Sequence, residues 1–492
     1  MSILTVGTAP GDYATLAAAV AAAGNGDTVA LPAGVYTNQT ATVTSDITIE
    51  GLGGVAYLNA TVPVSNAQGL LVVNAPGAVT IQGVAFSGAA TSNANGANAA
   101  GIRYFSGNLV LNQDAFSGNQ NGILATPLSA GTGSIGISNS TVTDNGVSDP
   151  ALTAGYGYTH NLYIGDVAQF TLTGSAVTAA NVGHEVKSRA VATTVTNSTI
   201  ADGPTGTASY SIDTPNGGAV GITGNTIQQG PQSQNDIIIS NGEEGVTHPG
   251  ALAVSGNTIV NNDANPGSLA VVNDGAAASV TGNLVAGLPA GQIDQSAPDT
   301  VSGNTISTTA PSVGVQVGVD GLTLASGAAV ANTALVSTAG PGFSALSAAG
   351  TPGMTLAISA TGVAGHIARF ALSQTGFTGT QATASFFDTS TGLAGAVVTW
   401  SVYADAGDTG FATTTLLGSR SFVDPGGGLL VSGAQGFTLP FTPSGAYALT
   451  EVVTIAGVPE PMSFVLLAGA VAGVAMARRR RRRRAPYYPP SS

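Results

Sequence analysis

Short runs of apolar and β-branched residues alternate with Gly- and Asn-containing turns along residues 80–306. A phrase of Gly or Asn, then Asn or Ser, then Thr or Ala, then Val or Ile recurs there at intervals of roughly 21 to 35 residues. Examples are Asn139–Val142, Asn197–Ile200 and Gly256–Ile259. Runs of this kind between turns predict strands, and a period in this range predicts a solenoid. Together the two signals predict a parallel β-helix.

The repeated asparagines are interpreted as structural. In a parallel β-helix each rung stacks about 4.8 Å above the previous one, so that equivalent turn residues form ladders. Asparagine tolerates the left-handed backbone conformation of a turn and can hydrogen-bond to its neighbours in such a ladder. These asparagines are therefore expected to hold the turns and not to carry chemistry.

The first rung is expected to follow a capping helix at residues 11–24, with Asp12 as N-cap and with Leu16 and Val20 on one face. Such a cap covers the apolar surface that an open coil end would expose. The strand-forming run Gly26–Tyr36 follows directly. This helix-then-strand opening resembles the pectate-lyase-like superfamily of right-handed parallel β-helices. The resemblance implies a right-handed coil and a carbohydrate-related function, without a particular reaction.

The pattern changes at about residue 312, where strict period-2 alternation begins. It is clear in Thr355–Ser359, Ala396–Tyr403 and Tyr447–Ile455, which are separated by turns rich in Gly, Pro and Asp. This alternation predicts an antiparallel β-sandwich, with Trp400 in its core.

Composition removes several classes. The chain has 492 residues, is 43% apolar and 8% charged, and contains 69 glycines and no cysteine. Helical bundles and coiled coils need more charge, disulfide-stapled modules need cysteines, and disordered chains are poorer in apolar residues. The length exceeds what one compact core supports, which agrees with a repetitive coil followed by a second domain.

The net charge of −13 is unevenly divided, with −19 in residues 1–457 and +6 in residues 458–492. An acidic body repels phosphate backbones, so no nucleic-acid partner is expected, and we expect a monomer. The basic tail contains Pro459, Glu460 and Pro461, then uncharged residues 462–477, then seven arginines at 478–484. The uncharged segment predicts a transmembrane helix of roughly 24 Å, and the arginines predict a cytoplasmic end.

This order of Pro-Glu-Pro, short apolar helix and arginine cluster resembles the PEP-CTERM sorting signal of exopolysaccharide-producing Gram-negative bacteria. The resemblance implies an exosortase as partner, cleavage near Pro459–Pro461, and transient anchoring in the inner membrane before release to the cell surface or extracellular matrix. Residues 447–461 also resemble the end of the spacer domain found beside such signals. Residues 1–12 lack the basic, apolar and small-residue order of an export signal, so a preceding leader or another start codon is expected.

The expected all-β chain thus has five segments. They are an N-terminal cap (1–27), a right-handed parallel β-helix (28–311), a β-sandwich spacer (312–457), the sorting signal with its transmembrane helix (458–484) and a disordered tail (485–492).

Residues with chemical potential gather in one region of the coil. Three of the four histidines, the only lysine and Arg189 lie between residues 159 and 248. In a strand, Glu185, Lys187 and Arg189 share one face, which is expected to point outward because the small apolar neighbours belong inside.

An interval of 24 residues places Asn161 below Glu185 and Tyr163 below Lys187. The same interval applied again places Ser211 above Lys187 and Asp213 above Arg189. A polar patch on one outer sheet is therefore expected, with Glu243, Glu244 and His248 approaching from the loop after the next strand.

Such a patch suits acidic polysaccharides. Removal of the proton α to a uronate carboxyl requires a base, a group that stabilises the enolate and an acid for the leaving oxygen. Lys187, Arg189, Tyr163 and His184 can fill these roles. A hydrolase would instead need two carboxylates, chosen from Glu185, Asp213, Glu243 and Glu244. The alternative is that Glu185 with Lys187, and Arg189 with Asp213, are solvated ion pairs.

The run Glu185–Ser188 resembles the β-helical family of chondroitinase-B and alginate lyases. That resemblance implies calcium-binding glutamates, a catalytic lysine and an arginine one rung later. Here the expected position one rung later is Ser211, and no arginine follows Arg189 before Arg369. The phrases around Asp213 and Glu243 also resemble bacterial β-helix proteins of undetermined activity. No zinc, phosphate-loop or nucleophile-elbow motif is present, no cofactor is expected, and nothing in the scattered acidic residues supports calcium.

The sequence therefore predicts an exported surface protein that binds or processes extracellular polysaccharide. Two classes stay open, a lyase, epimerase or hydrolase on one side and a non-catalytic structural or adhesive protein on the other. The catalytic candidates are Tyr163, His184, Glu185, Lys187, Arg189 and Asp213. The binding candidates are His160, Asn161, Glu243, Glu244 and His248.

Overall fold

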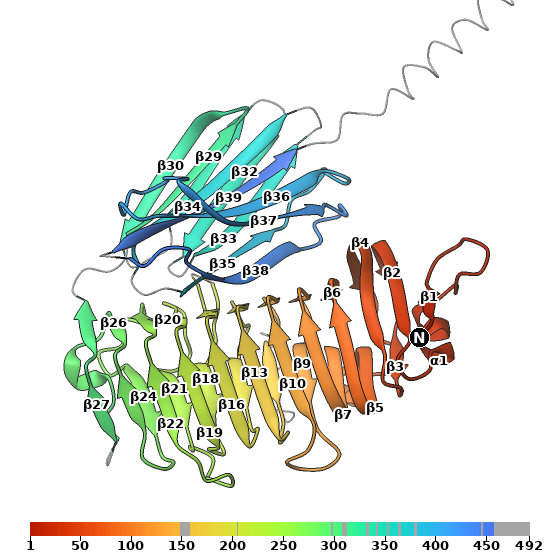
Figure 1. Ribbon diagram of the computed structural model, residues 1–492, viewed down its shortest axis with the longest axis horizontal. Helices are drawn as coiled ribbons and strands as arrows, with labels where there is room; N and C mark the ends of the chain where they lie inside the picture. Colours follow the sequence, from red (N-terminus) through yellow and green to blue (C-terminus); the bar gives the residue numbers. More distant parts are fainter. Residues whose placement is uncertain are drawn as a thin grey trace, which may run out of the picture.

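The computed structural model describes residues 1–147, 158–203, 205–296, 299–307, 312–330, 334–340, 343–351, 354–362, 366–377, 381–443 and 446–456. Within them the chain is all-β, with 39 strands, one α-helix and two 3-10 turns. A long parallel coil ends with β28 (Thr305–Ser307), and a second unit of two packed sheets begins with β29 (Ser312–Val319). Figure 1 shows the second unit lying along one side of the coil. The predicted parallel all-β architecture is observed, and its right-handed sense stays a prediction.

The coil is built from three columns of parallel strands, each strand pairing with its equivalent one rung away. The first column runs through β1 (Ile3–Thr5), β2 (Thr28–Thr37), β4 (Thr48–Asn59), β5 (Gly69–Gln82), β7 (Ala100–Asn112), β10 (Ser134–Ser138), β13 (Gln169–Thr173), β16 (Ala192–Thr196), β19 (Ala219–Thr223), β22 (Leu252–Ser255), β25 (Ser279–Thr281) and β27 (Thr300–Ser302). The second continues from β2 and β4 through β6 (Val84–Ser87), β8 (Ala115–Ser117), β11 (Thr141–Thr143), β14 (Ala176–Thr178), β17 (Thr199–Ala201), β20 (Thr226–Gln229), β23 (Thr258–Asn261), β26 (Leu284–Ala286) and β28. The third runs from β3 (Ala41–Val43) through β5, β7, β9 (Asn121–Ala125), β12 (Leu162–Ile164), β15 (His184–Ser188), β18 (Tyr210–Thr214), β21 (Ile237–Asn241) and β24 (Leu269–Asn273).

A ladder of buried polar side chains runs inside the coil at the turn between the first and second columns. Each backbone N–H donates to the side-chain oxygen one rung further on, as from Ser198 to Asn225 (2.9 Å) and from Asn225 to Asn257 (2.9 Å). The residue before each ladder position takes the left-handed conformation, as Asn197 does at φ 49°. The predicted structural role of the repeated phrase is therefore confirmed, with the turn and the ladder assigned to neighbouring positions. The members of the ladder are Asp114, Ser140, Ser175, Ser198, Asn225, Asn257, Asn283 and Asn304.

A second internal ladder ends on two carboxyl groups. It runs through Asn145 and Asn161, and the Asn161 side-chain amide donates to Glu185. The backbone N–H of Ala180 also donates to Glu185 at 2.8 Å, and Glu185 hydrogen-bonds to Asp202. Complete burial, and then the charge of Asp202, raise the pKa of Glu185 well above its usual range, while burial raises the pKa of Asp202 to about 6. The two carboxyl groups therefore retain a proton between them at pH values where exposed carboxyls are ionised.

The N-terminal end is closed by the short helix α1 (Leu16–Ala22), whose Leu16 and Val20 are buried as predicted. The predicted N-cap is wrong, because the Thr15 side chain accepts the capping hydrogen bond from Ala18 N at 3.2 Å. Asp12 instead accepts from Ala9 N at 3.0 Å and stabilises the turn before the helix. Strand β1, which precedes the helix and pairs with β2, was not predicted.

The second unit is a sandwich in which the predicted core residue Trp400 is 1% exposed and donates to Glu451 at 2.5 Å. One sheet has the order β30 (Leu322–Val330), β29, β34 (Ile367–Phe377), β39 (Tyr447–Ala456), β36 (Val397–Asp405) and β37 (Thr415–Val423). The other has the order β31 (Ala334–Gly340), β32 (Phe343–Thr351), β33 (Thr355–Gly362), β35 (Gln381–Asp388) and β38 (Val431–Thr438). The expectation of purely antiparallel sheets is wrong at one pair, since β33 and β35 are parallel.

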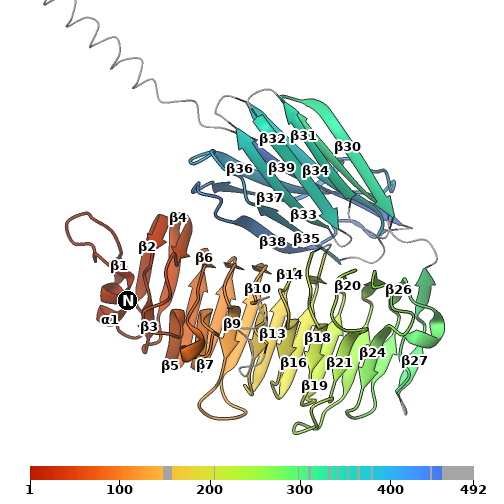
Figure 2. The same cartoon turned by 180° about the vertical axis from the view of Figure 1, so that it is seen from behind.

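The sandwich packs against the coil near its second column, as both views show (Figures 1 and 2). Thr141 of β11 hydrogen-bonds to Ser432 of β38 at 2.6 Å, and Ala176 of β14 packs with Phe387 and Ala434. A cavity of about 630 Å³ lies between the two units. The contacts described between the two units therefore involve the second column and the adjoining turn, and not the third column.

The sorting signal proposed from Pro459, Glu460 and Pro461 lies outside the described residues, as do the predicted helix at 462–477 and the arginine cluster. Within the described ranges no helix has the length and apolar character needed to cross a bilayer.

The buried Glu185–Asp202 pair predicts a stability that falls with rising pH. Both pKa values are raised in the folded chain, so it retains protons that the unfolded chain loses above about pH 4, and stability is lost as pH rises through the raised values. Glu185→Gln keeps the hydrogen bonds without the ionisable group. We expect this variant to be more stable by on the order of 1–3 kcal/mol near neutral pH, with a flatter pH profile. Denaturant unfolding across the pH range checks this, with Glu50→Gln, a half-buried carboxyl bound to Gln82, as the matched control. A Glu185→Gln profile parallel to the wild-type profile would contradict it.

Candidate functional site

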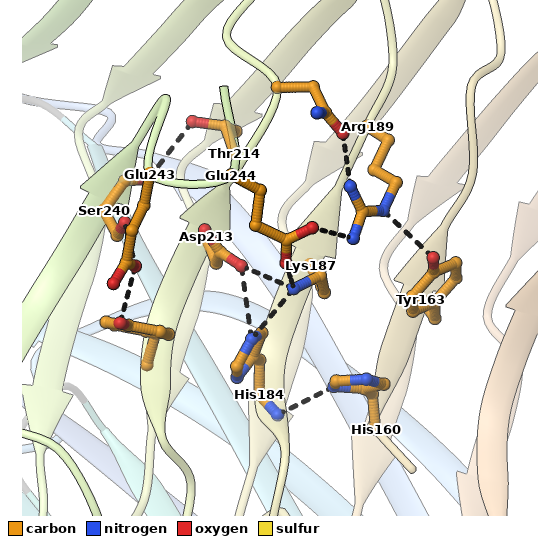
Figure 3. Close-up of polar contacts among 12 residues, drawn as sticks. His160, Tyr163, His184, Lys187, Arg189, Asp213, Thr214, Ser240, Glu243 and Glu244 are labelled. Carbon is orange, nitrogen blue, oxygen red and sulfur yellow. Dashed lines mark hydrogen bonds and ion pairs between the residues drawn. The ribbon is translucent and has the colours of Figure 1, made fainter. Parts of the chain in front are cut away.

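Three successive strands of the third column, β12, β15 and β18, carry the candidate site. Their register pairs Tyr163 with Lys187 and Lys187 with Asp213. The predicted interval of 24 residues therefore holds for the first step, and the second step is 26 residues. Figure 3 shows the resulting row on the outer face of the coil.

The predicted positions of Asp213 above Arg189 and of Ser211 above Lys187 are wrong. The turn between β17 and β18 comprises residues 202–209, whereas the turn between β14 and β15 comprises only residues 179–183. The longer turn shifts the register and brings Asp213 next to Lys187. A carboxylate therefore occupies the place where a hydroxyl was expected.

Glu185 and Asn161 do not belong to the outer face, which corrects two predicted site residues. Both side chains are fully buried in the internal ladder, and Val186 after Glu185 is buried as well. Strand alternation fails here because the chain turns a corner as the strand begins. His184 and Lys187, which flank the two buried residues, consequently both lie on the outer side, within contact of one another.

Lys187 is the centre of the site. Its Nζ lies 3.0 Å from Asp213 Oδ2, 2.7 Å from Glu244 Oε1 and 3.4 Å from His184 Nε2. Asp213 Oδ2 also lies 3.2 Å from His184 Nε2. The Lys187 and Asp213 side chains are buried, with 9% and 2% exposed, whereas 46% of the Glu244 side chain is exposed. We call the set that includes their hydrogen-bonded neighbours the Lys187 cluster: Tyr163, His184, Lys187, Arg189, Asp213 and Glu244.

Arg189 connects the two edges of the Lys187 cluster. Its Nη2 donates to Glu244 Oε2 at 2.5 Å, its Nε donates to the Tyr163 hydroxyl oxygen at 3.0 Å, and its Nη1 donates to Asn216. Partial burial acts to raise the pKa of Glu244, but the hydrogen bonds from Lys187 and Arg189 outweigh it and the pKa is lowered. The Glu244 carboxylate is thus held as an anion between an ammonium and a guanidinium group.

The remaining binding candidates surround the cluster. Glu243 accepts from Tyr210 at 2.6 Å and from Ser240 at 3.2 Å, and it makes no printed contact with Lys187 or Arg189 in the described structure. His248 pairs with Asp166 at 3.0 Å. Neither residue is brought into the Lys187 cluster, although both lie on the loop after β21 as expected.

His160 supports the cluster from within. Its Nδ1 accepts from the backbone N–H of His184 at 3.0 Å, and its ring packs against those of Tyr163 and His184. Burial and then the positive charges nearby, those of His184, Lys187 and Arg189, lower the pKa of His160 well below its usual range. His160 is therefore a neutral packing residue that orients its neighbours.

Sequence reasoning missed Tyr210, Asn216 and Asp166. Tyr210 stacks on His184 with ring centroids 5.0 Å apart, directly continuing the row that begins at His160. The register step of 26 residues links His184 to Tyr210 and Lys187 to Asp213, so one correct turn length would have found both pairs. Asn216 and Asp166 lie in turns, where no periodic signal marks them.

Two atoms of the cluster have unused hydrogen-bonding capacity. Asp213 Oδ1 and His184 Nδ1 are buried and have no hydrogen-bond partner among the described residues. The described part of the chain contains no group of three or more His, Asp or Glu side chains arranged to hold a metal ion. The cluster therefore offers proton-transfer groups and a cationic carboxylate-binding fork.

No family model and no curated protein matches the chain. Among solved structures it is similar to an alginate lyase from Paenibacillus sp. str. FPU-7, with 19% identity and a TM-score of 0.43, over 62% of this chain and 99% of that one. It is also similar to the enzymatically active domain of tailspike protein 4 of bacteriophage CBA120, with 11% identity and a TM-score of 0.23, over 89% of this chain and 63% of that one. Because both TM-scores lie below 0.5, these likenesses carry no argument about the chemistry of this chain.

The geometry predicts unequal contributions of the two carboxylates to stability. Asp213→Ala leaves a buried ammonium group with Glu244 as its remaining carboxylate, and we expect a loss of about 3 kcal/mol. Glu244→Gln removes a partly exposed partner and is expected to cost less than about 1 kcal/mol. Denaturant unfolding of both variants at neutral pH checks the order, and a larger loss for Glu244→Gln would refute it.

Proposed function

We propose that this chain binds uronate-containing polysaccharide and cleaves it by β-elimination at the Lys187 cluster. One observation supports this most directly. Lys187 and Arg189 already hold a carboxylate, that of Glu244, on the open outer face of the coil. A carboxylate from a sugar acid has the same charge and the same pair of acceptor oxygens, so it can bind this fork when the mobile-sided Glu244 gives way.

The elimination needs three contributions from the cluster. Lys187 and Arg189 bind the uronate carboxylate and stabilise the negative charge that develops on it as the α proton leaves. The Tyr163 hydroxyl gives its proton to the leaving glycosidic oxygen and takes up the α proton, so its own protonation state is restored. The C–H bond and the glycosidic C–O bond break, a C=C bond forms within the sugar ring, and no water is consumed.

Tyr163 is assigned the proton transfer because of its position. Its oxygen accepts from Arg189 Nε at 3.0 Å, which leaves its own O–H available, and the side chain is half-buried at the edge of the cluster. His184 is turned toward Asp213 and Lys187 and is almost fully buried, so it acts as a positioning residue for the lysine.

A hydrolase is less well supported, because each candidate carboxylate is engaged. Asp213 is bound by Lys187 and His184, Glu244 by Lys187 and Arg189, and Glu243 by Tyr210. A glycosidase needs one carboxyl group to donate a proton and a second to act as base or nucleophile. Carboxylates held by cations are poor proton donors.

We further propose the location implied by the sequence. Recognition of Pro459–Pro461 by an exosortase, after transient anchoring through residues 462–477, would place the coil at the cell surface or in the extracellular matrix of a Gram-negative bacterium. Acidic exopolysaccharide is the substrate class present there, which agrees with a carboxylate-binding fork.

The proposal predicts the formation of unsaturated uronate ends. Wild-type protein is incubated with a panel of uronans and neutral glycans, and the ultraviolet absorbance of the unsaturated product is followed. We expect Tyr163→Phe to lower kcat by at least about a hundredfold with little change in affinity, because only the proton transfer is lost. Lys187→Ala is expected to weaken binding and turnover together. Tyr403→Phe, at a half-buried tyrosine of β36 in the sandwich, is the matched control.

The outcomes separate the functional classes. Uronate binding without any unsaturated product would favour the alternative of a non-catalytic adhesive protein. Activity that survives in Tyr163→Phe would remove Tyr163 from the mechanism. Cleavage confined to neutral glycans would overturn the proposal.

Glu244 is expected to compete with substrate. Glu244→Gln removes the resident negative charge while the Lys187 and Arg189 side chains stay in place. We expect its affinity for uronate oligosaccharides to increase by roughly threefold to tenfold, since a partly exposed ion pair no longer has to be broken. Calorimetric titration measures the change, with Asp274→Asn, at an exposed acid one rung further on, as control. Weaker binding by Glu244→Gln would show that Glu244 assists the ligand instead of competing with it.

A further inference from the structure

The row that contains Tyr163 and Lys187 extends toward the N-terminus and reaches an arginine. In the third column Arg103 of β7 pairs with Leu124 of β9, Leu124 with Tyr163, and Tyr163 with Lys187. Ile102 and Tyr104 on either side of Arg103 are fully buried in the coil core. Arg103 therefore points outward, on the same face as the Lys187 cluster.

Arg103 is a cation without a partner in the described structure. No hydrogen bond or ion pair joins it to any described residue, and its Nε is buried without an acceptor. Its guanidinium lies over the Phe105 ring at 5.4 Å from the centroid, and burial lowers the pKa of the group. Arg189, in contrast, is matched by Glu244, Tyr163 and Asn216. A partly buried guanidinium left unmatched is costly unless a ligand supplies the missing acceptor.

The spacing between the two cationic positions suits a polymer. Three rungs separate Arg103 from Lys187, which corresponds to about 14 Å at the usual distance between paired strands. A 1,4-linked uronate residue spans about one rung. Leu124 and Tyr163 lie between the two positions and carry no charge. A chain laid along the coil axis with one carboxylate at the Lys187 cluster would therefore bring the carboxylate three residues away to Arg103.

We propose that Arg103 forms a second carboxylate subsite, so that the coil takes a polyuronate lying along its axis, bound at Arg103 and at the Lys187–Arg189 fork. This inference rests on the proposed function and names its substrate more closely. The ligand is an acidic chain of at least four residues, and a single sugar acid or a disaccharide occupies only the fork.

The test compares ligand lengths. Oligouronides from disaccharide to hexasaccharide are titrated calorimetrically into the full chain carrying Tyr163→Phe, which removes cleavage but keeps the cationic groups. We expect affinity to rise by roughly tenfold to a hundredfold when the ligand becomes long enough to reach Arg103, the increment of a hydrogen bond to a charged group. Adding Arg103→Gln is expected to abolish this rise and to leave disaccharide affinity unchanged. Arg369→Gln, an arginine of β34 in the sandwich, serves as the matched control and is expected to retain the rise.

Each outcome has a defined meaning. A rise that persists in Arg103→Gln overturns the second subsite and leaves the proposed function intact. Equal weakening of short and long ligands by Arg103→Gln also overturns it, because damage to the whole face would act on both. Absence of uronate binding at every length overturns the proposed function, and the subsite with it.

Discussion

The hydrogen bonding of each rung to the next is the constraint on which the rest of the structure depends. It sets the distance between equivalent residues, and it decides which side chains lie side by side, since a slip of one residue would turn a strand inside out. Inside the coil the same register aligns Ser198, Asn225 and Asn257 into a ladder in which buried polar groups satisfy one another. Outside it aligns Tyr163 and Lys187. A core ladder and a surface row thus have one cause, and a change in one turn length alters both.

Scarcity of charge gives the Lys187 cluster its character. A body with few ionisable groups has little long-range potential with which to compensate a buried ammonium, so the compensation must come from direct contacts. Asp213 supplies it from the neighbouring rung and Glu244 from a loop. The first is buried and permanent, whereas the second is partly exposed and exchangeable. The free energy with which an acidic ligand binds is therefore a difference, because it must replace the Glu244 contacts before it adds its own.

The parts of the fold that were predicted from sequence are those with a repeating signal. The recurrent phrase around Asn197 and Asn257 predicts strands, turns and a polar ladder, and all three are present. The spacing from Tyr163 to Lys187 was likewise predicted, because that rung has the regular length. Prediction failed where the local geometry is irregular. Asp213 was misplaced because the turn before β18 is longer, and Glu185 was assigned to the surface because alternation stops at a corner. Neither event leaves a mark in residue type alone.

The misplaced Glu185 has a consequence for the site in front of it. It lies one residue from His184 and two from Lys187, yet its side chain points into the coil and shares a hydrogen bond with Asp202. Burial favours its neutral form, so it brings no negative charge behind the cluster. Were it ionised and turned outward, as alternation predicts, it would be a third carboxylate competing for Lys187. The internal ladder, by keeping Glu185 inside and protonated, leaves the lysine to be balanced only by Asp213 and by the exchangeable Glu244. The carboxylate-binding fork thus depends on a polar core contact as much as on its own residues.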